Sequence, residues 1–135
     1  MPLPDGFYEW TKSETTPFYI SLNDETPMVF AGLWETWNSP EGLVESCSIY
    51  TTDANDMMGR LHDRIPVILP MPMIGAWLDP RFSHTVALKA MLQRHSSDEM
   101  KAWEVAKAVG NVKNQGPELM ELIEPPEPLE FKSVT

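Results

Sequence analysis

The chain has 135 residues, a length that fits one domain with one hydrophobic core. Hydrophobic residues make up 42% of it, and its apolar runs are too short to span a membrane, so we expect a soluble protein of the cytoplasm or nucleoid. The formal net charge of -10 argues against a polyanionic partner, because phosphate binding relies largely on Lys and Arg.

The first half of the chain predicts a β-meander. Short runs rich in aromatic and β-branched residues are separated by polar turns that contain Pro, Asn, Asp or Gly. The predicted strands cover residues 7–10, 18–22, 27–37 and 43–52.

The segment that follows predicts a short helix and an irregular strand. Asp53 is positioned to cap a helix that runs to Arg60. Residues 62–69 then favour an extended conformation, but Pro66 lacks the N–H that a central strand would donate. We therefore expect residues 62–69 to form an irregular edge strand.

The second half predicts short helices on the outside of the sheets. Residues 74–78 form one or two helical turns, and Ser83 can cap a better helix. Residues 101–109 return as a strand, whereas the Pro-rich acidic residues 124–135 predict a tail. The expected fold class is α+β, rich in β-structure, with a few short peripheral helices.

The stretch PDGFYEW at residues 4–10 places Glu9 among three aromatic residues. In an extended chain Glu9 shares a face with Phe7, while Tyr8 and Trp10 occupy the other face. A carboxylate among apolar neighbours loses hydration, which suits it to proton transfer. The alternative interpretation is an ordinary solvated Glu on a strand, since Glu is seldom fully buried.

A second polar site is predicted at residues 62–64. An extended chain puts His62 and Arg64 on one side and Asp63 on the other, so a titratable imidazole lies beside a permanent cation. An imidazole can pass protons while a guanidinium holds an anion. The alternative is a surface turn whose charges are simply solvated.

The remaining candidate residues carry less chemistry. Cys47 lies in a strand run with no basic residue close in sequence, so we expect a buried core thiol rather than a nucleophile. His84 and His95 lack the spacing of a zinc site, and one cysteine cannot form an internal disulfide. We predict no metal and no cofactor.

Four motifs in this order are similar to the SRAP family, the SOS response-associated peptidases. They are PDGFYEW at 4–10, SIYTTDAN at 48–55, LHDRIPVIL at 61–69 and VGNVKNQGPEL at 109–119. The resemblance covers residues 4 to about 122 and implies a compact, barrel-like SRAP fold of curved antiparallel sheets. It assigns residues 1–123 to the C-terminal portion of a single SRAP domain.

For function, the resemblance implies protection of abasic sites in single-stranded DNA by a covalent crosslink. In the family an N-terminal cysteine supplies an amine and a thiol, which condense with the sugar aldehyde to a thiazolidine. Carried over by position, Glu9 and His62 assist the proton transfers as acid/base groups, and Arg64 and Trp10 contact DNA.

The start of this sequence departs from the family pattern. Family members begin Met-Cys-Gly-Arg, whereas this sequence begins Met1-Pro2-Leu3-Pro4, and Cys47 has no free α-amine with which to form the five-membered ring. We therefore expect this chain to be inactive by itself and to self-associate through the strand edges that an incomplete sheet exposes. Two alternatives stay open: a thiol autopeptidase that processes itself, and a non-catalytic module that binds DNA or protein.

Overall fold

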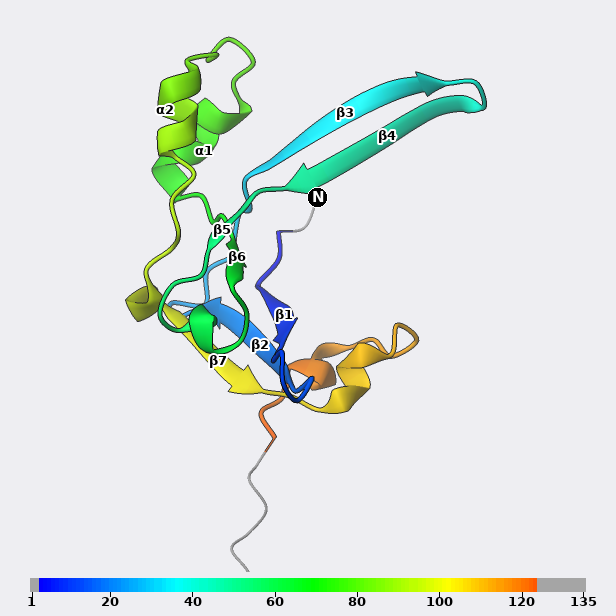
Figure 1. Cartoon of the computed structure of the whole chain (residues 1–135), viewed down its shortest axis with the longest axis vertical. Helices are drawn as coiled ribbons and strands as arrows, with labels where there is room; N and C mark the ends of the chain where they lie inside the picture. The colour runs from blue at the N-terminus through cyan, green and yellow to red at the C-terminus, as the bar shows by residue number, and fades with distance from the viewer. Residues whose placement is uncertain (1–2, 124–135) are drawn as a thin grey trace, which may run out of the picture.

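The computed structural model describes residues 3–123 and contains three small antiparallel sheets with short helices (Figure 1). The strands are β1 (Gly6–Trp10), β2 (Pro17–Leu22), β3 (Gly32–Ser39), β4 (Gly42–Ile49), β5 (Thr51–Asp53), β6 (Arg64–Pro66) and β7 (Met100–Glu104). The α-helices are α1 (Met71–Leu78) and α2 (Thr85–Ala90). The 3₁₀ helices are η1 (Met58–Arg60), η2 (Ser97–Glu99), η3 (Lys107–Gly110) and η4 (Pro117–Met120).

The largest sheet has the strand order β1-β2-β7, so β1 lies at an edge. Its register pairs Phe7 with Ile20 and Glu9 with Phe18, while Tyr8 pairs with Tyr19. Because side chains alternate along a strand, these pairs divide the sheet into an inner face with Phe7 and Glu9 and an outer face with the tyrosines.

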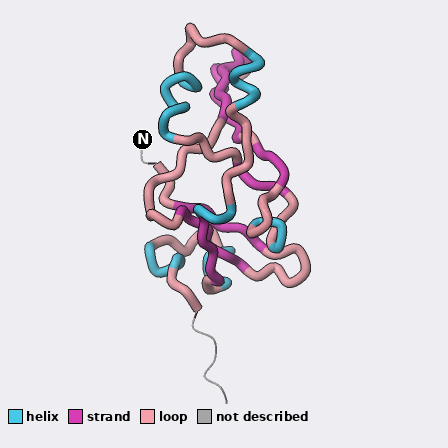
Figure 2. The backbone as a smooth tube through the Cα atoms, turned by 90° about the vertical axis from the view of Figure 1, so that its left-hand side faces the viewer, coloured by secondary structure: helices cyan, strands magenta, loops and turns pink. Residues whose placement is uncertain are grey.

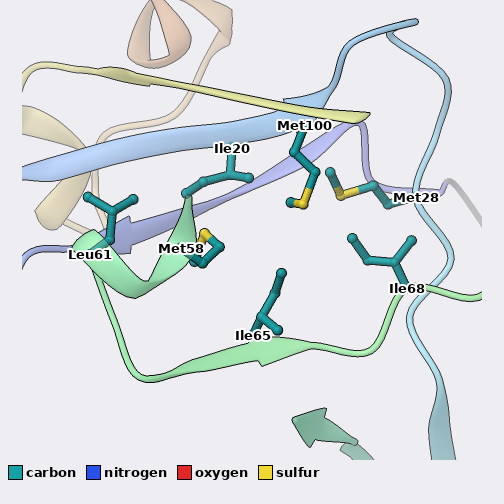
Figure 3. Packing of buried hydrophobic residues seen from close by; sticks show 7 residues of the cluster. All are labelled: Ile20, Met28, Met58, Leu61, Ile65, Ile68 and Met100. Atoms are coloured by element: carbon teal, nitrogen blue, oxygen red, sulfur yellow. The ribbon is translucent and has the colours of Figure 1, made fainter. Parts of the chain in front are cut away.

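The hydrophobic core fills the space between the inner face of this sheet and the segment from η1 to β6 (Figure 3). Seven buried residues form it: Ile20, Met28, Met58, Leu61, Ile65, Ile68 and Met100. Three of these are Met, whose flexible thioether side chains fill irregular gaps between elements that do not stack in regular layers. This packing positions the backbone of the segment after η1, which carries His62 and Arg64.

The strands β3 and β4 form a long two-stranded ribbon that projects away from the rest of the molecule (Figure 1). All of β4 is exposed, and Trp34 of β3 is 75% exposed. The prediction of a buried Cys47 is therefore wrong: the thiol is exposed on β4, opposite Trp34. Strand patterning identified the strand, but burial depends on a covering layer that the ribbon does not have in residues 3–123.

The two α-helices lie together at one end of the molecule, beyond the β5–β6 pair (Figures 1 and 2). They cover a second, smaller cluster in which Ala31, Val67 and Leu69 are buried and residues such as Ile74 and Trp77 pack against them. The prediction of outer helices over apolar surface agrees with this arrangement. No helix in residues 3–123 is long and apolar enough to cross a membrane.

Two predicted helix caps are corrected by the structure. The turn before η1 is closed by Asn55, whose side-chain oxygen accepts a hydrogen bond from the Met58 N–H at 2.9 Å, while Asp53 lies in β5. Similarly, His84 rather than Ser83 caps α2, by accepting from the Ala87 N–H at 3.1 Å. Each cap was predicted a residue or two early, because several side chains in a row can accept such bonds.

Three predicted strands are shorter than expected. Residues 27–37 contribute β3 only from Gly32 onward, and before it Phe30 makes a single bridge to Ile68. The run 43–52 is interrupted at Tyr50. The pairing of β4 with β3 ends at Ile49, and the Tyr50 N–H donates a hydrogen bond to the Ala31 carbonyl oxygen. The predicted strand 101–109 ends at Glu104 and passes into η3.

The β-rich α+β class with antiparallel sheets and few helices is confirmed. Within the described residues the three sheets stay separate and do not close into a barrel. The predicted tail at 124–135 lies outside the described residues.

Candidate functional site

Glu9 lies on the edge strand β1 and shares the inner face with Phe7, as its sequence position predicts. Its side chain is half-buried, and its Oε1 accepts a hydrogen bond from the Trp10 backbone N–H at 3.0 Å. That bond turns the carboxylate back along its own strand. The second oxygen, Oε2, makes no hydrogen bond within residues 3–123.

His62 follows η1 and is also half-buried. Its Nδ1 accepts a hydrogen bond from the Arg64 backbone N–H at 3.0 Å. A nitrogen that accepts such a bond carries no proton, so the neutral ring has its proton on Nε2. The local turn therefore presents His62 as an Nε2–H donor.

An ion pair and apolar packing connect the parts of the chain that carry Glu9 and His62. Lys12, in the turn after β1, forms an ion pair with Asp63. The hydrogen bond and the charge of Lys12 hold the pKa of Asp63 below its ordinary value of 3.8. In addition, Phe7 packs against the hydrophobic cluster that contains Leu61.

The Lys12–Asp63 ion pair is thus a direct contact between the two predicted site segments, while no hydrogen bond joins Glu9 to His62 within residues 3–123. Sequence reasoning missed the part played by Lys12 and Asp63. The alternation at residues 62–64 indicated that Asp63 points away from His62, but the partner of Asp63 lies 51 residues earlier in the chain.

The Arg64 guanidinium is held by contacts with Thr51 and Asp53 that its sequence context did not indicate. Its guanidinium donates to the Thr51 carbonyl oxygen at 2.7 Å and pairs with Asp53 Oδ1 at 3.0 Å. Nε donates to the Thr51 hydroxyl at 3.2 Å. A phosphate would therefore share the guanidinium with Asp53 or displace that carboxylate.

Trp10 ends β1 and is 37% exposed, on the face opposite to Glu9. Its backbone N–H donates to the Glu9 carboxylate. Within residues 3–123 no group of three or more His, Cys, Asp or Glu side chains is arranged to hold a metal ion.

Comparison with known proteins identifies relatives of this chain. Residues 3–112 match the family model described as "SOS response associated peptidase (SRAP)". The chain is 40% identical over 121 residues to the abasic site processing protein YoqW of Bacillus subtilis, covering 87% of this chain and 54% of YoqW. It is 30% identical over 143 residues to the abasic site processing protein HMCES of Xenopus tropicalis, covering 90% of this chain and 42% of HMCES.

A solved structure has the same fold. A crystallised protein from Bacteroides thetaiotaomicron superposes with a TM-score of 0.78 at 25% identity, over 89% of this chain and 54% of that protein. The chain therefore spans about half the length of the curated relatives it matches. With the family model matching most of its length, the chain belongs to the SRAP family.

Proposed function

We propose that this chain contributes Glu9 and His62 to a site that crosslinks abasic sites in single-stranded DNA. The observation that carries the proposal is the match to YoqW, a protein named for abasic site processing, over 87% of this chain. The family model also spans both residues.

The reaction needs an aldehyde, an amine and a thiol. An abasic sugar exists as a closed ring and as an open-chain aldehyde. The amine of an N-terminal cysteine condenses with the aldehyde carbon and releases water, and the thiol then adds to the resulting C=N carbon to close a thiazolidine. The protein thereby becomes bonded to the DNA through both the nitrogen and the sulfur of one residue.

His62 and Glu9 suit the two proton transfers of this sequence. The Nε2–H of His62 can donate to the ring oxygen of the sugar while the ring opens. The free oxygen of Glu9 can take a proton from the attacking amine and return it to the departing hydroxyl. The exposed ion pair between Lys12 and Asp63 links the two segments.

The nucleophile itself must come from elsewhere. Cys47 is the single cysteine of the sequence and lies within β4, so its nitrogen is tied up in a peptide bond. A thiazolidine can form only on a cysteine with a free amine, in polypeptide other than these 135 residues. The same polypeptide would bring cations for the DNA backbone, which the net charge of -10 calls for.

The test joins the part of YoqW that lies outside the match to the full 135-residue chain and incubates the fusion with single-stranded DNA containing one abasic site. We expect a band that survives denaturing electrophoresis. Glu9→Gln or His62→Ala should slow its formation by about 100-fold, the usual scale for one acid/base group. The control is Glu41→Gln, at the ribbon turn, which should have no effect.

The 135-residue chain alone should form no such band. A folded fusion that forms no crosslink, or one in which both site variants react as fast as the control, would refute the proposal. Weak DNA binding without a covalent product would instead favour a non-catalytic binding module.

A further inference from the structure

The outer face of the β1-β2-β7 sheet carries a row of three aromatic rings. Tyr8 and Tyr19 have ring centroids 5.4 Å apart, and those of Tyr19 and Trp103 are 5.2 Å apart. Trp103 Nε1 donates to the Met120 carbonyl oxygen at 2.7 Å, which holds the η4 segment over the end of the row. The row lies on the opposite side of the sheet from Glu9.

A pocket of about 350 Å³ opens beside this row. Its lining consists of two aromatic rings, two carboxylates, a hydroxyl and a thioether: Tyr19, Trp103, Asp5, Glu25, Ser21 and Met120. The volume lies at the lower end of the range for pockets that hold small ligands. The site described above uses none of these residues.

Ser21 gives the first indication of a ligand. The residue is only 4% exposed, and its hydroxyl oxygen has no hydrogen-bond partner within the described residues. A buried hydroxyl without a partner is unfavourable, because it has lost water and gained nothing in return. A ligand that carries an N–H donor would restore the missing bond.

The charges around the pocket give the second indication. The Lys101 ammonium already lies 2.9 Å from Glu25 Oε1 and 5.5 Å from the centre of the Trp103 ring. The chain thus places one alkylammonium of its own between a carboxylate and an aromatic face. Asp5 has no ion pair within residues 3–123, and after burial its charge is the next cause of the raised pKa of Tyr19.

We propose that this pocket binds an organic cation with N–H donors, an alkylammonium or a guanidinium. The cation lies against the Tyr19 ring, which attracts it through its negative face. Its N–H groups donate to the Asp5 carboxylate and to the Ser21 hydroxyl. An anion is disfavoured because two carboxylates, Asp5 and Glu25, line the same pocket.

The same chemistry is available from a free amine or from a basic side chain of a polypeptide, and two probes distinguish these sources. Agmatine represents the free cation, and the capped tripeptide acetyl-Gly-Arg-Gly-amide represents the polypeptide. Tetramethylammonium, which has the charge but no N–H, is the control ligand. The readout is the indole N–H resonance of Trp103 in the NMR spectrum of the full chain, assigned with Trp103→Phe.

We expect saturable shifts of this resonance with agmatine, the tripeptide or both, and a much weaker response to tetramethylammonium. Asp5→Asn and Ser21→Ala should each weaken binding by about tenfold, the loss of one charge-assisted or buried hydrogen bond. Lys101→Met should strengthen it, because the internal cation no longer competes. Glu41→Gln is the matched control for a carboxylate removed elsewhere.

Shifts with agmatine alone assign the pocket to a free cation, and shifts with the tripeptide alone assign it to a polypeptide. No saturable shift with either probe in wild type and Lys101→Met overturns the proposal, and the Ser21 hydroxyl then binds water only. Equal binding by Glu41→Gln and Asp5→Asn also overturns it. Because Glu9 lies on the other sheet face, these outcomes are independent of the crosslinking reaction.

Discussion

At the scale of single residues, Gly6 shows how the PDGFYEW motif serves the fold as well as the site. A Cβ on Gly6 would lie 2.3 Å from the Ile20 carbonyl oxygen and 2.6 Å from Cζ of the Tyr19 ring. The Tyr19 ring therefore lies across Gly6, and the aromatic row of the outer face requires a residue without a side chain at this position.

We predict that Gly6→Ala lowers the free energy of unfolding by about 1–3 kcal/mol, because a backbone oxygen cannot move aside for the new methyl group. Urea denaturation followed by circular dichroism measures it. Gly59→Ala is the control, since a Cβ there meets no atom within 4 Å. Equal stability of the two variants would contradict the close approach at Gly6.

Asp63 is the residue whose ionisation reports the link between the two site segments. Lys12 holds the pKa of Asp63 below 3.8, so the folded state prefers the carboxylate. The stabilising effect of the pair is present above the ordinary pKa and is lost as the pH falls through the lowered folded pKa.

In Lys12→Met we expect the pKa of Asp63 to return toward 3.8, measured by NMR titration of its side-chain carboxyl carbon. The pKa of Asp79, which is lowered by Arg81, should stay unchanged and serves as the internal control. If Asp63 titrates identically in both proteins, Lys12 and Asp63 do not pair in solution.

At the scale of elements, the β3–β4 ribbon differs most from an ordinary globular domain. Both of its faces carry large exposed apolar side chains: Trp34, Leu43 and Ile49 on one, and Leu33, Trp37 and Val44 on the other. Its charged residues are Glu35, Glu41 and Glu45, without a cation. An isolated two-stranded ribbon is marginally stable in water, and uncovered strand edges pair readily with other chains.

We predict that the 135-residue chain self-associates through this ribbon. The double variant Trp34→Ser/Trp37→Ser should shift the protein toward monomer in sedimentation velocity, with association weakened by at least about tenfold because two large aromatic surfaces are lost. Val112→Ser, at an apolar residue that is 90% exposed elsewhere, should leave association unchanged. A wild-type chain that stays monomeric at all concentrations would contradict the prediction.

At the scale of the whole molecule, the three sheets are held together by one modest core and a smaller cluster, and they do not enclose a common interior within residues 3–123. The chain also spans about half of YoqW and of the Bacteroides structure. The exposed ribbon and the excess of acidic residues are both understandable if further polypeptide completes the surface.

Local sequence patterns predicted the strands and helices whose formation depends on neighbouring residues in the chain. The aromatic runs at residues 7–10 and 18–22 became β1 and β2 with one residue added to each, and alternation put Glu9 on the same face as Phe7. Helix periodicity also indicated the two α-helices, although α1 begins at Met71 rather than at residue 74. Of the helix predicted from Asp53 to Arg60, only η1 (Met58–Arg60) is helical. Caps and strand ends were less predictable, because neighbouring polar residues compete for the same backbone groups.

The sequence by itself determined the family, the β-rich class and the two polar segments around Glu9 and His62, because motif order and side-chain alternation are properties of the chain. Only the tertiary structure decided the rest. The pairing of Lys12 with Asp63, the exposure of Cys47 and the pocket at Ser21 all depend on which distant segments meet, and local pattern carries no information about that.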